Sequence, residues 1–176
     1  MANASLVLTV ISADRPGLVE TLSETIAAHG ASWLESRMAH LAGQFAGLLR
    51  VSVPEARADE LAADLRSLDA QGLRVIVESA GTEPDERSAR IRLDLVGLDR
   101  PGIVREIASA LAARAINVEE LESRTSSAPM SGETLFHVNA WLRIPTETAA
   151  EELRKTLEKL ADEMMVELTL SDGLES

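Results

Sequence analysis

The sequence predicts an α+β fold in which one unit of four strands and two helices occurs twice. Asp14-Arg15-Pro16-Gly17 recurs 85 positions later as Asp99-Arg100-Pro101-Gly102. Ordered matches continue across most of both halves, which indicates a tandem duplication. Strand-like and helix-like spacings of apolar residues follow one another in the same order in each half. The chain therefore forms two domains of roughly 80–90 residues, each large enough for a modest core.

The first strand, bend and helix can be assigned in both copies. Residues 5–12 are rich in Val, Leu and Ile, and their counterparts around Leu93 alternate between apolar and charged residues, as in a half-buried strand. The Asp-Arg-Pro-Gly bend comes next. Apolar residues four apart then predict a helix in each copy. They are Leu18, Leu22 and Ile26, mirrored by Ile103, Ile107 and Leu111. The proline of the bend suits a helix start, and Gly30 suits the end of the first helix.

The remaining elements complete the unit. Two strands follow the helix in each copy, at residues 32–42 and 44–53 and at 117–127 and 135–144. A second helix begins after Pro54 or Pro145, and a last strand runs through 73–77 or 166–170. The order β-α-β-β-α-β is that of a ferredoxin-like unit, an antiparallel four-stranded sheet with helices on one face. We expect domains at 1–80 and 89–176, joined by a linker at 81–88.

The spacing of the matches predicts a longer turn in the second copy. Leu34-Glu35-Ser36-Arg37 recurs as Leu121-Glu122-Ser123-Arg124 at an offset of 87, and Phe45 matches Phe136 at a larger offset still. The additional turn, 126–132, is long and polar. It suits either a lid over a partner or ligand, or a disordered hairpin tip.

Composition limits the classes of function. The net charge is −12. Both halves are acidic: residues 1–80 have 6 basic and 10 acidic side chains, and residues 81–176 have 11 basic and 19 acidic ones. Neutralised phosphates supply most non-specific DNA affinity, so direct nucleic-acid binding is not expected. The chain has no cysteine, hence no disulfide and no thiolate metal site. Without a signal-like start or an apolar run of about 20 residues, we expect a cytoplasmic protein with no membrane contact.

These residues carry a resemblance to a known family. The β-α-β-β-α-β unit with its Asp-Arg-Pro-Gly bend resembles the ACT domain, a small regulatory module that senses amino acids. The tandem resembles the glycine cleavage system transcriptional repressor family, with the residues from Ser123 to Phe136 similar to that family's long turn. The resemblance implies two tandem ACT domains, a non-enzymatic regulatory function, glycine as ligand and a DNA-binding transcription activator as partner. It also implies a homo-oligomer, because ACT-like sheets commonly extend across subunits.

The bend is the candidate ligand-binding site. Amide groups at a helix start lack partners and favour a carboxylate, and a glycine lets a ligand approach the backbone closely. The ligand's ammonium could meet the aspartate. The resemblance adds a polar residue at the start of the second strand. The expected ligand-binding residues are Asp14, Arg15, Pro16, Gly17, Leu18 and Ser32 in the first copy, and Asp99, Arg100, Pro101, Gly102, Ile103 and Asn117 in the second. Gly102→Val is expected to abolish binding with little loss of fold.

A structural interpretation of the bend stays open, since aspartate caps helices and proline fixes φ. An arginine of the bend is then a solvated or ion-paired side chain. A ligand-independent interaction module, working through sheet edges or faces, is the alternative function.

Other residue types give no catalytic constellation, so we expect neither an enzyme nor a metal or cofactor. The three histidines have no ligand spacing. Glu119, Glu120 and Glu122 are interpreted as solvated residues of a strand. Trp141 lies on the polar side of its strand, where it would pack against the other copy.

Overall fold

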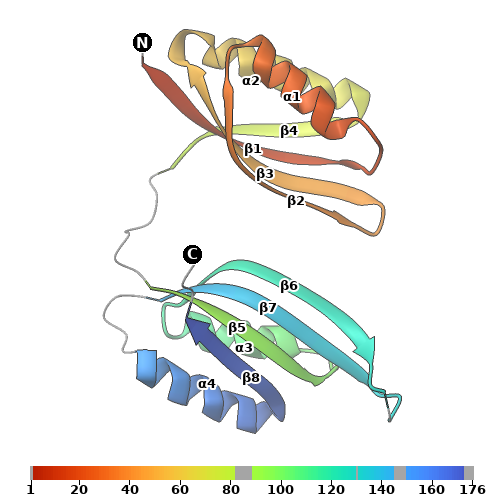
Figure 1. Ribbon diagram of the computed structural model, residues 1–176, viewed down its shortest axis with the longest axis vertical. Coiled ribbons are helices and arrows are strands. Elements are labelled where there is room, and N and C mark those ends of the chain that lie inside the picture. Colours follow the sequence, from red (N-terminus) through yellow and green to blue (C-terminus); the bar gives the residue numbers. More distant parts are fainter. Residues whose placement is uncertain (1, 82–88, 130, 145–149, 173–176) are drawn as a thin grey trace. The chain divides into compact units, whose positions relative to one another are not determined.

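The computed structural model describes residues 2–81, 89–129, 131–144 and 150–172 (Figure 1). Contacts divide the chain into two compact units, Met1–Glu83 and Pro84–Ser176. We call them unit 1 and unit 2. Most of the expected linker, and Pro145, lie outside the described residues.

Unit 1 has the predicted element order. Its elements are β1 (Asn3–Ala13), α1 (Leu18–Ala28), β2 (Ser32–Leu41), β3 (Gln44–Pro54), α2 (Ala58–Ser67) and β4 (Leu73–Ser79). Short 3-10 helices, η1 (Glu55–Arg57) and η2 (Leu68–Gln71), flank α2. The four strands form an antiparallel sheet in the order β2-β3-β1-β4.

Unit 2 repeats this topology. Its elements are β5 (Ala89–Leu98), α3 (Ile103–Ala112), β6 (Asn117–Ser127), β7 (Thr134–Ile144), α4 (Ala150–Met164) and β8 (Val166–Asp172). The sheet order is β6-β7-β5-β8, again antiparallel. The predicted fold, two ferredoxin-like units in tandem, is confirmed.

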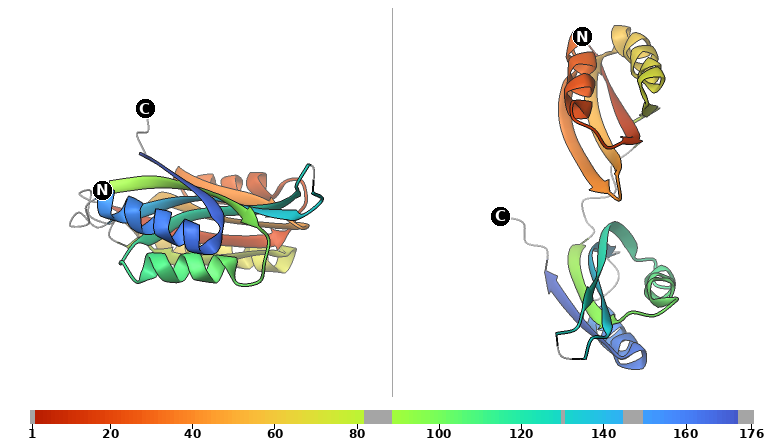
Figure 2. Two further views of the ribbon diagram at one scale, coloured as in Figure 1. Left: turned by 90° about the horizontal axis from the view of Figure 1, so that it is seen from below. Right: turned by 90° about the vertical axis from the view of Figure 1, so that its right-hand side faces the viewer.

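Each unit has an aliphatic core between its sheet and its helices. In unit 1, Leu8, Leu22 and Leu65 are fully buried, and in unit 2 Leu142 and Leu157 take the same part. Burying such a side chain stabilises a fold by about 1.5–3 kcal/mol. The two helices of each unit lie on one face of its sheet (Figure 2), so the opposite face carries no helix. We call the opposite face the open face.

The strand register locates the longer turn of the second copy. Trp33 pairs with Val51, and Val118 pairs with Leu142, immediately before a β-bulge in both units. From these equivalent pairs, the residue numbers of β6 exceed those of β2 by 85, and the residue numbers of β7 exceed those of β3 by 91. All the additional residues therefore lie in the β6–β7 turn. The Leu-Glu-Ser-Arg match at offset 87 is not a structural equivalence, because the register places Glu122 where unit 1 has Arg37.

Candidate ligand-binding bends

The two Asp-Arg-Pro-Gly bends have the same backbone conformation. Each connects the first strand of its unit to the first helix, and its glycine is the helix N-cap. Gly17 has φ of 89° and Gly102 has φ of 93°, in the left-handed region that glycine adopts without strain. A valine there would be strained, so the expectation that Gly102→Val leaves the fold nearly intact is wrong.

Among the described residues, most backbone amides at the two helix starts have no acceptor. The first hydrogen bond of α1 runs from the Thr21 amide to the Gly17 carbonyl, at 2.9 Å. In the described part of unit 1, the amides from Gly17 to Glu20 have no acceptor in the protein. In unit 2 the Ile103 amide donates weakly to the Arg100 carbonyl, at 3.4 Å. Such free donors, at the positive end of a helix dipole, favour an anionic group.

Neither aspartate caps its helix, contrary to the structural interpretation of the bend. No side chain caps α1 or α3. Instead, the backbone amides of the aspartates tie each bend to the neighbouring hairpin. Asp14 donates to the Gly43 carbonyl at 2.9 Å, and Asp99 donates to the Thr134 carbonyl at 2.8 Å. The Asp14 carboxylate lies 3.6 Å from Nε2 of His40.

The arginines of the two bends have different partners. Arg15 donates to the Gln71 carbonyl at 2.8 Å, which ties the bend to the turn before β4. Arg100 donates twice to the carboxylate of Glu106, at 2.8 and 2.7 Å. These hydrogen bonds lower the pKa of Glu106 and raise the pKa of Arg100. A carboxylate therefore already stands beside the second bend.

The other expected residues divide into backbone and side-chain candidates. The side chains of Leu18 and Ile103 are buried in the cores, so these two residues can offer a ligand only their amides. Pro16 and Pro101 are exposed.

Ser32 and Asn117 are exposed, but each lies at the far end of its own sheet from the bend. Ser32 aligns with Ser52 and, through it, with Ser5 near the start of β1, whereas the bend follows Ala13 at the end of β1. Eight residues of strand span roughly 26 Å. Asn117 aligns in the same way with Arg143 and Arg90. One unit alone therefore does not bring its bend and its second-strand residue to the same ligand.

A shallow depression lies near the end of the first strand in each unit. In unit 1 it is lined by residues that include Ser12, Asp69 and Gly72, and in unit 2 by their counterparts Gly97, Asp162 and Met165. Neither depression is lined by Gly17 or Gly102. A ligand at a bend would therefore rest on the helix start and not in these depressions.

The open face of unit 2 holds an ionic network that the sequence interpretation missed. Glu119 lies in the β6 bulge, and its side chain is only 15% exposed. It accepts from Nε of Arg90, at 3.0 Å, and from Nε of Arg143. Arg90 also pairs with Glu120 at 2.6 Å and stacks on Trp141, 4.3 Å from the ring centre. Glu119 is thus not solvated, and Trp141 has a packing partner within its own unit.

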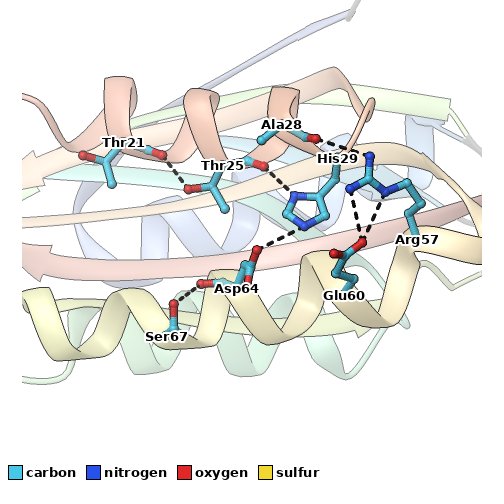
Figure 3. Close-up of polar contacts among 8 residues, drawn as sticks. All are labelled: Thr21, Thr25, Ala28, His29, Arg57, Glu60, Asp64 and Ser67. Carbon is cyan, nitrogen blue, oxygen red and sulfur yellow. Dashed lines mark hydrogen bonds and ion pairs between the residues drawn. The ribbon is translucent and has the colours of Figure 1, made fainter.

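A second polar cluster joins the two helices of unit 1 (Figure 3). His29, at the end of α1, is buried, with its Nδ1 3.0 Å from the Thr25 carbonyl and its Nε2 3.1 Å from the Asp64 carboxylate. The Thr25 carbonyl and the Asp64 carboxylate are both hydrogen-bond acceptors. Arg57 donates to the Ala28 carbonyl, at 3.3 Å, so a guanidinium group lies at the negative end of α1.

Other kinds of site were sought in the same part of the chain. Among the described residues, no three His, Asp or Glu side chains gather as a metal-ligand set. None of the described helices is both long enough and apolar enough to cross a lipid bilayer.

Comparison with known proteins agrees with the architecture. A family model described as "ACT domain" matches residues 4–78, and a second with the same description matches residues 90–162. Fold, duplicated bend and family matches together define a protein of two regulatory-type α+β modules. The chain belongs to the ACT-domain family.

Relatives match nearly the whole chain. The glycine cleavage system transcriptional repressor of Escherichia coli (strain K12) is 24% identical over 163 residues, which covers 90% of this chain and 85% of that protein. A crystal structure of an unknown protein from Galdieria sulphuraria superposes with a TM-score of 0.87 at 28% identity, covering 98% of this chain and 100% of the other. A crystal structure provisionally described as a glycine cleavage system transcriptional repressor gives a TM-score of 0.73 at 20% identity, over 97% and 98% of the two chains. The last similarity shows the fold alone.

Proposed function

We propose that the protein is a non-enzymatic regulator that senses a small amino acid and acts on a transcription regulator by direct protein contact. The observation that carries the proposal is the duplicated glycine bend, with free amides at a helix start in both units. The similarity to a glycine cleavage system transcriptional repressor favours glycine as the ligand and a transcription activator as the partner.

A free amino acid fits the chemistry of the bend. Its carboxylate would accept hydrogen bonds from the amides that follow Gly17, where the helix dipole adds to the attraction. Its ammonium would meet a carboxylate such as Asp14, and Asp99 offers the same group in unit 2. Ser32 and Asn117 lie at the far ends of their own sheets, so we propose that a ligand at a bend meets such a residue only from another ACT domain.

Both bends have a carboxylate at nearly the same distance from the glycine, but only the one in unit 2 is paired with an arginine of the bend. The Glu106 carboxylate lies beside Gly102, 3.8 Å from where a Cβ would stand. In unit 1 the nearest carboxylate to the equivalent point is Glu20, at 4.0 Å. Because Arg100 neutralises Glu106, both bends remain candidates.

The charge of the chain favours a protein partner. A net charge of −12 repels the phosphates of nucleic acid. A role in transcription without DNA contact reconciles this charge with the similarity to a repressor. No catalytic constellation is proposed.

Calorimetry on the full chain tests the sensing half of the proposal. Glycine, serine and the branched-chain amino acids are titrated to millimolar concentration, and glycine is expected to give heat. Gly17→Ala and Gly102→Ala place a methyl group over the bend, and the variant at the live bend should lose at least about tenfold in affinity. Gly30→Ala is the matched control, because Gly30 also has a positive φ, +66°, but lies at the end of α1. No heat with any amino acid would remove the sensing function, and equal losses in all three variants would remove the bends as its site.

A ligand-independent interaction module is the second candidate. It is favoured by the position of the depressions, which the bends do not line. Capture of a partner whose binding ignores every amino acid would support it.

A further inference from the structure

The depression at the end of β5 in unit 2 is larger than its counterpart in unit 1. Its volume is 480 Å³, against 280 Å³ in unit 1. Most of the residues that line it are apolar, among them Val96, Leu98, Leu135 and Met165. The charged residues of the lining are Asp162 and Glu167. Apolar side chains bordered by charged ones are typical of a protein interface.

Both charged residues of this lining are acidic, unlike those of unit 1. The register places Arg74 at the position of Glu167, and Arg74 lies 3.6 Å from the Asp69 carboxylate in the lining of unit 1. Within the described residues, neither the Asp162 nor the Glu167 side chain has a hydrogen-bond or ion-pair partner. Two such carboxylates beside an apolar lining favour an apolar group that has a positive charge next to it.

The arginine and lysine side chains around the depression are engaged elsewhere or are distant. Arg100 of the bend donates to Glu106, and Lys159 of α4 lies 3.9 Å from Glu163. Arg124 lies on β6, the opposite edge of the sheet, two strands and roughly 10 Å away from β5. A partner must therefore supply the positive charge.

Met165 gives a separate indication that a partner covers the depression. It follows α4 directly and has a positive φ of 53°, where unit 1 has Gly72 with φ of 79°. A residue with a side chain is strained in this conformation, and glycine avoids the strain. Met165 is nevertheless 87% exposed at the depression, and Leu98 is 49% exposed. A flexible thioether at such a position suits contact with a partner's side chain.

We propose that the depression of unit 2 binds a polypeptide segment of the partner in which an aliphatic side chain is flanked by lysine or arginine. The proposal rests on the protein-contact half of the proposed function and does not depend on amino-acid sensing. The aliphatic side chain packs on Val96, Leu135 and Met165, and the basic side chains pair with Asp162 and Glu167. Because β8 begins at the depression and is an edge strand, an extended segment can approach alongside it.

Titration with two pentapeptides tests the proposal on the full chain, labelled with ¹³C at its methionine ε-methyl groups. The first peptide has leucine between two lysines, with an alanine and a blocking group at each end. In the second peptide glutamates replace the lysines. The lysine peptide should shift the Met165 methyl signal, which Met165→Gly identifies, and the buried Met164 should be unmoved. No shift with the lysine peptide at millimolar concentration, or equal shifts with both peptides, would overturn the proposal.

Met165→Gly separates docking from folding. It introduces the residue of unit 1 and relieves the strained φ, so the unfolding temperature of unit 2 should rise. The dissociation constant of the lysine peptide, followed by the Val96 amide signal, should rise at least about tenfold. Ala115→Gly is the matched control, because Ala115 also has a positive φ, 55°, but lies between α3 and β6, and it should leave the constant unchanged. Unchanged binding in Met165→Gly would contradict the docking role.

Charge reversal tests the flanking basic residues. Glu167→Arg, the residue of unit 1, should weaken the lysine peptide at least about fivefold and strengthen the glutamate peptide. Glu151→Arg, in the first turn of α4, changes the net charge equally and should leave both constants unchanged. Equal effects of the two variants would overturn the proposal. A Met165 signal that moves with protein concentration alone would also overturn it, in favour of a second copy. Calorimetry with amino acids is a separate measurement, so an absence of heat with glycine leaves this proposal standing.

Discussion

The two units have one backbone design but different open faces. The β-bulge that carries Leu34 in unit 1 carries Glu119 in unit 2. Leu34 is 52% exposed, whereas Glu119 is held between Arg90 and Arg143. Unit 1 has small serines, Ser5 and Ser52, where unit 2 has these arginines. The comparison indicates that bend, bulge and register tolerate two opposite surface chemistries.

On the helix-facing sides of the two sheets the residues also differ, but there the summed side-chain volume of a cross-strand pair is kept. Met38 pairs with Gly47 in unit 1, and the equivalent pair in unit 2 is Ser123 with Val138. The larger residue has moved to the other strand of the pair. A packed interior tolerates such exchanges when the summed volume is preserved.

Gly47→Val should have the largest effect on stability. A Cβ at Gly47 would lie 2.5 Å from the Met38 side chain and 3.0 Å from the Arg37 carbonyl, so we expect unit 1 to lose about 3 kcal/mol. Adding Met38→Ser, which reproduces the pair of unit 2, should recover most of the loss. Each unit has one tryptophan, so urea unfolding in a Trp141→Phe background follows unit 1 through Trp33. A double variant no more stable than Gly47→Val would contradict the exchange of volume.

Glu119→Leu should destabilise unit 2 by about 2 kcal/mol. It introduces the residue of unit 1 at the bulge and leaves the Arg90 and Arg143 guanidinium groups half-buried side by side without their shared carboxylate. Adding Arg90→Ser and Arg143→Ser completes the unit 1 set and should recover most of the loss. The unfolding midpoint of unit 2 gives the measurement. Leu34→Glu in unit 1 is the control and should change stability by less than about 0.5 kcal/mol, since that position is exposed.

His29→Ala should cost unit 1 about 1.5 kcal/mol. The substitution removes two contacts of a buried ring, to the Thr25 carbonyl and to Asp64, and leaves a small void between α1 and α2. Arg114 occupies the equivalent place after α3 and is exposed, so Arg114→Ala should cost little. Equal losses in the two variants would show that His29 does not join the helices.

Substitutions at the C-terminal ends of α1 and α3 should have a smaller effect on stability. Gly30 and Ala115 both adopt positive φ, 66° and 55°, and donate to equivalent carbonyls at 2.9 and 3.0 Å. An alanine is strained in this conformation, so Ala115→Gly should stabilise unit 2 by about 1 kcal/mol and Gly30→Ala should destabilise unit 1 by about as much. Thermal unfolding of both variants gives the measurement, and changes of the same sign would contradict the argument.

The sequence predicted the features that repeat and missed those that do not. The Asp-Arg-Pro-Gly bend and the apolar spacing around Leu22 and Leu157 are local signals, and they located nearly every strand and helix. The network at Glu119 could not be predicted, because it depends on a bulge and on register across three strands. A bulge leaves no reliable mark in a single sequence. The separation of Ser32 from its bend likewise becomes visible only once the sheet order is known.

The pair formed by Arg100 and Glu106 should give the smallest effect, because it is exposed to solvent. Unit 1 has no such pair, since Thr21 occupies the position of Glu106 and donates to the Gly17 carbonyl. Hydrogen bonds from Arg100 lower the pKa of Glu106 in the folded state. A lowered folded pKa means that the pair stabilises unit 2 above the ordinary carboxyl pKa, and that this contribution disappears as the pH falls through the lowered value.

Titration of the Glu106 carboxyl by NMR, with and without Arg100→Ala, isolates this contribution. The carboxyl should titrate at a higher pH in the variant, and added salt should narrow the difference because exposed ion pairs are screened. Glu106→Thr, the residue of unit 1, should make unit 2 slightly less stable at neutral pH and leave it unchanged in acid. If the carboxyl titrates at the same pH in both proteins, the pair has no effect on the bend. The Arg100–Glu106 pair would then not distinguish the two bends as anion sites, and the difference would depend on their remaining partners.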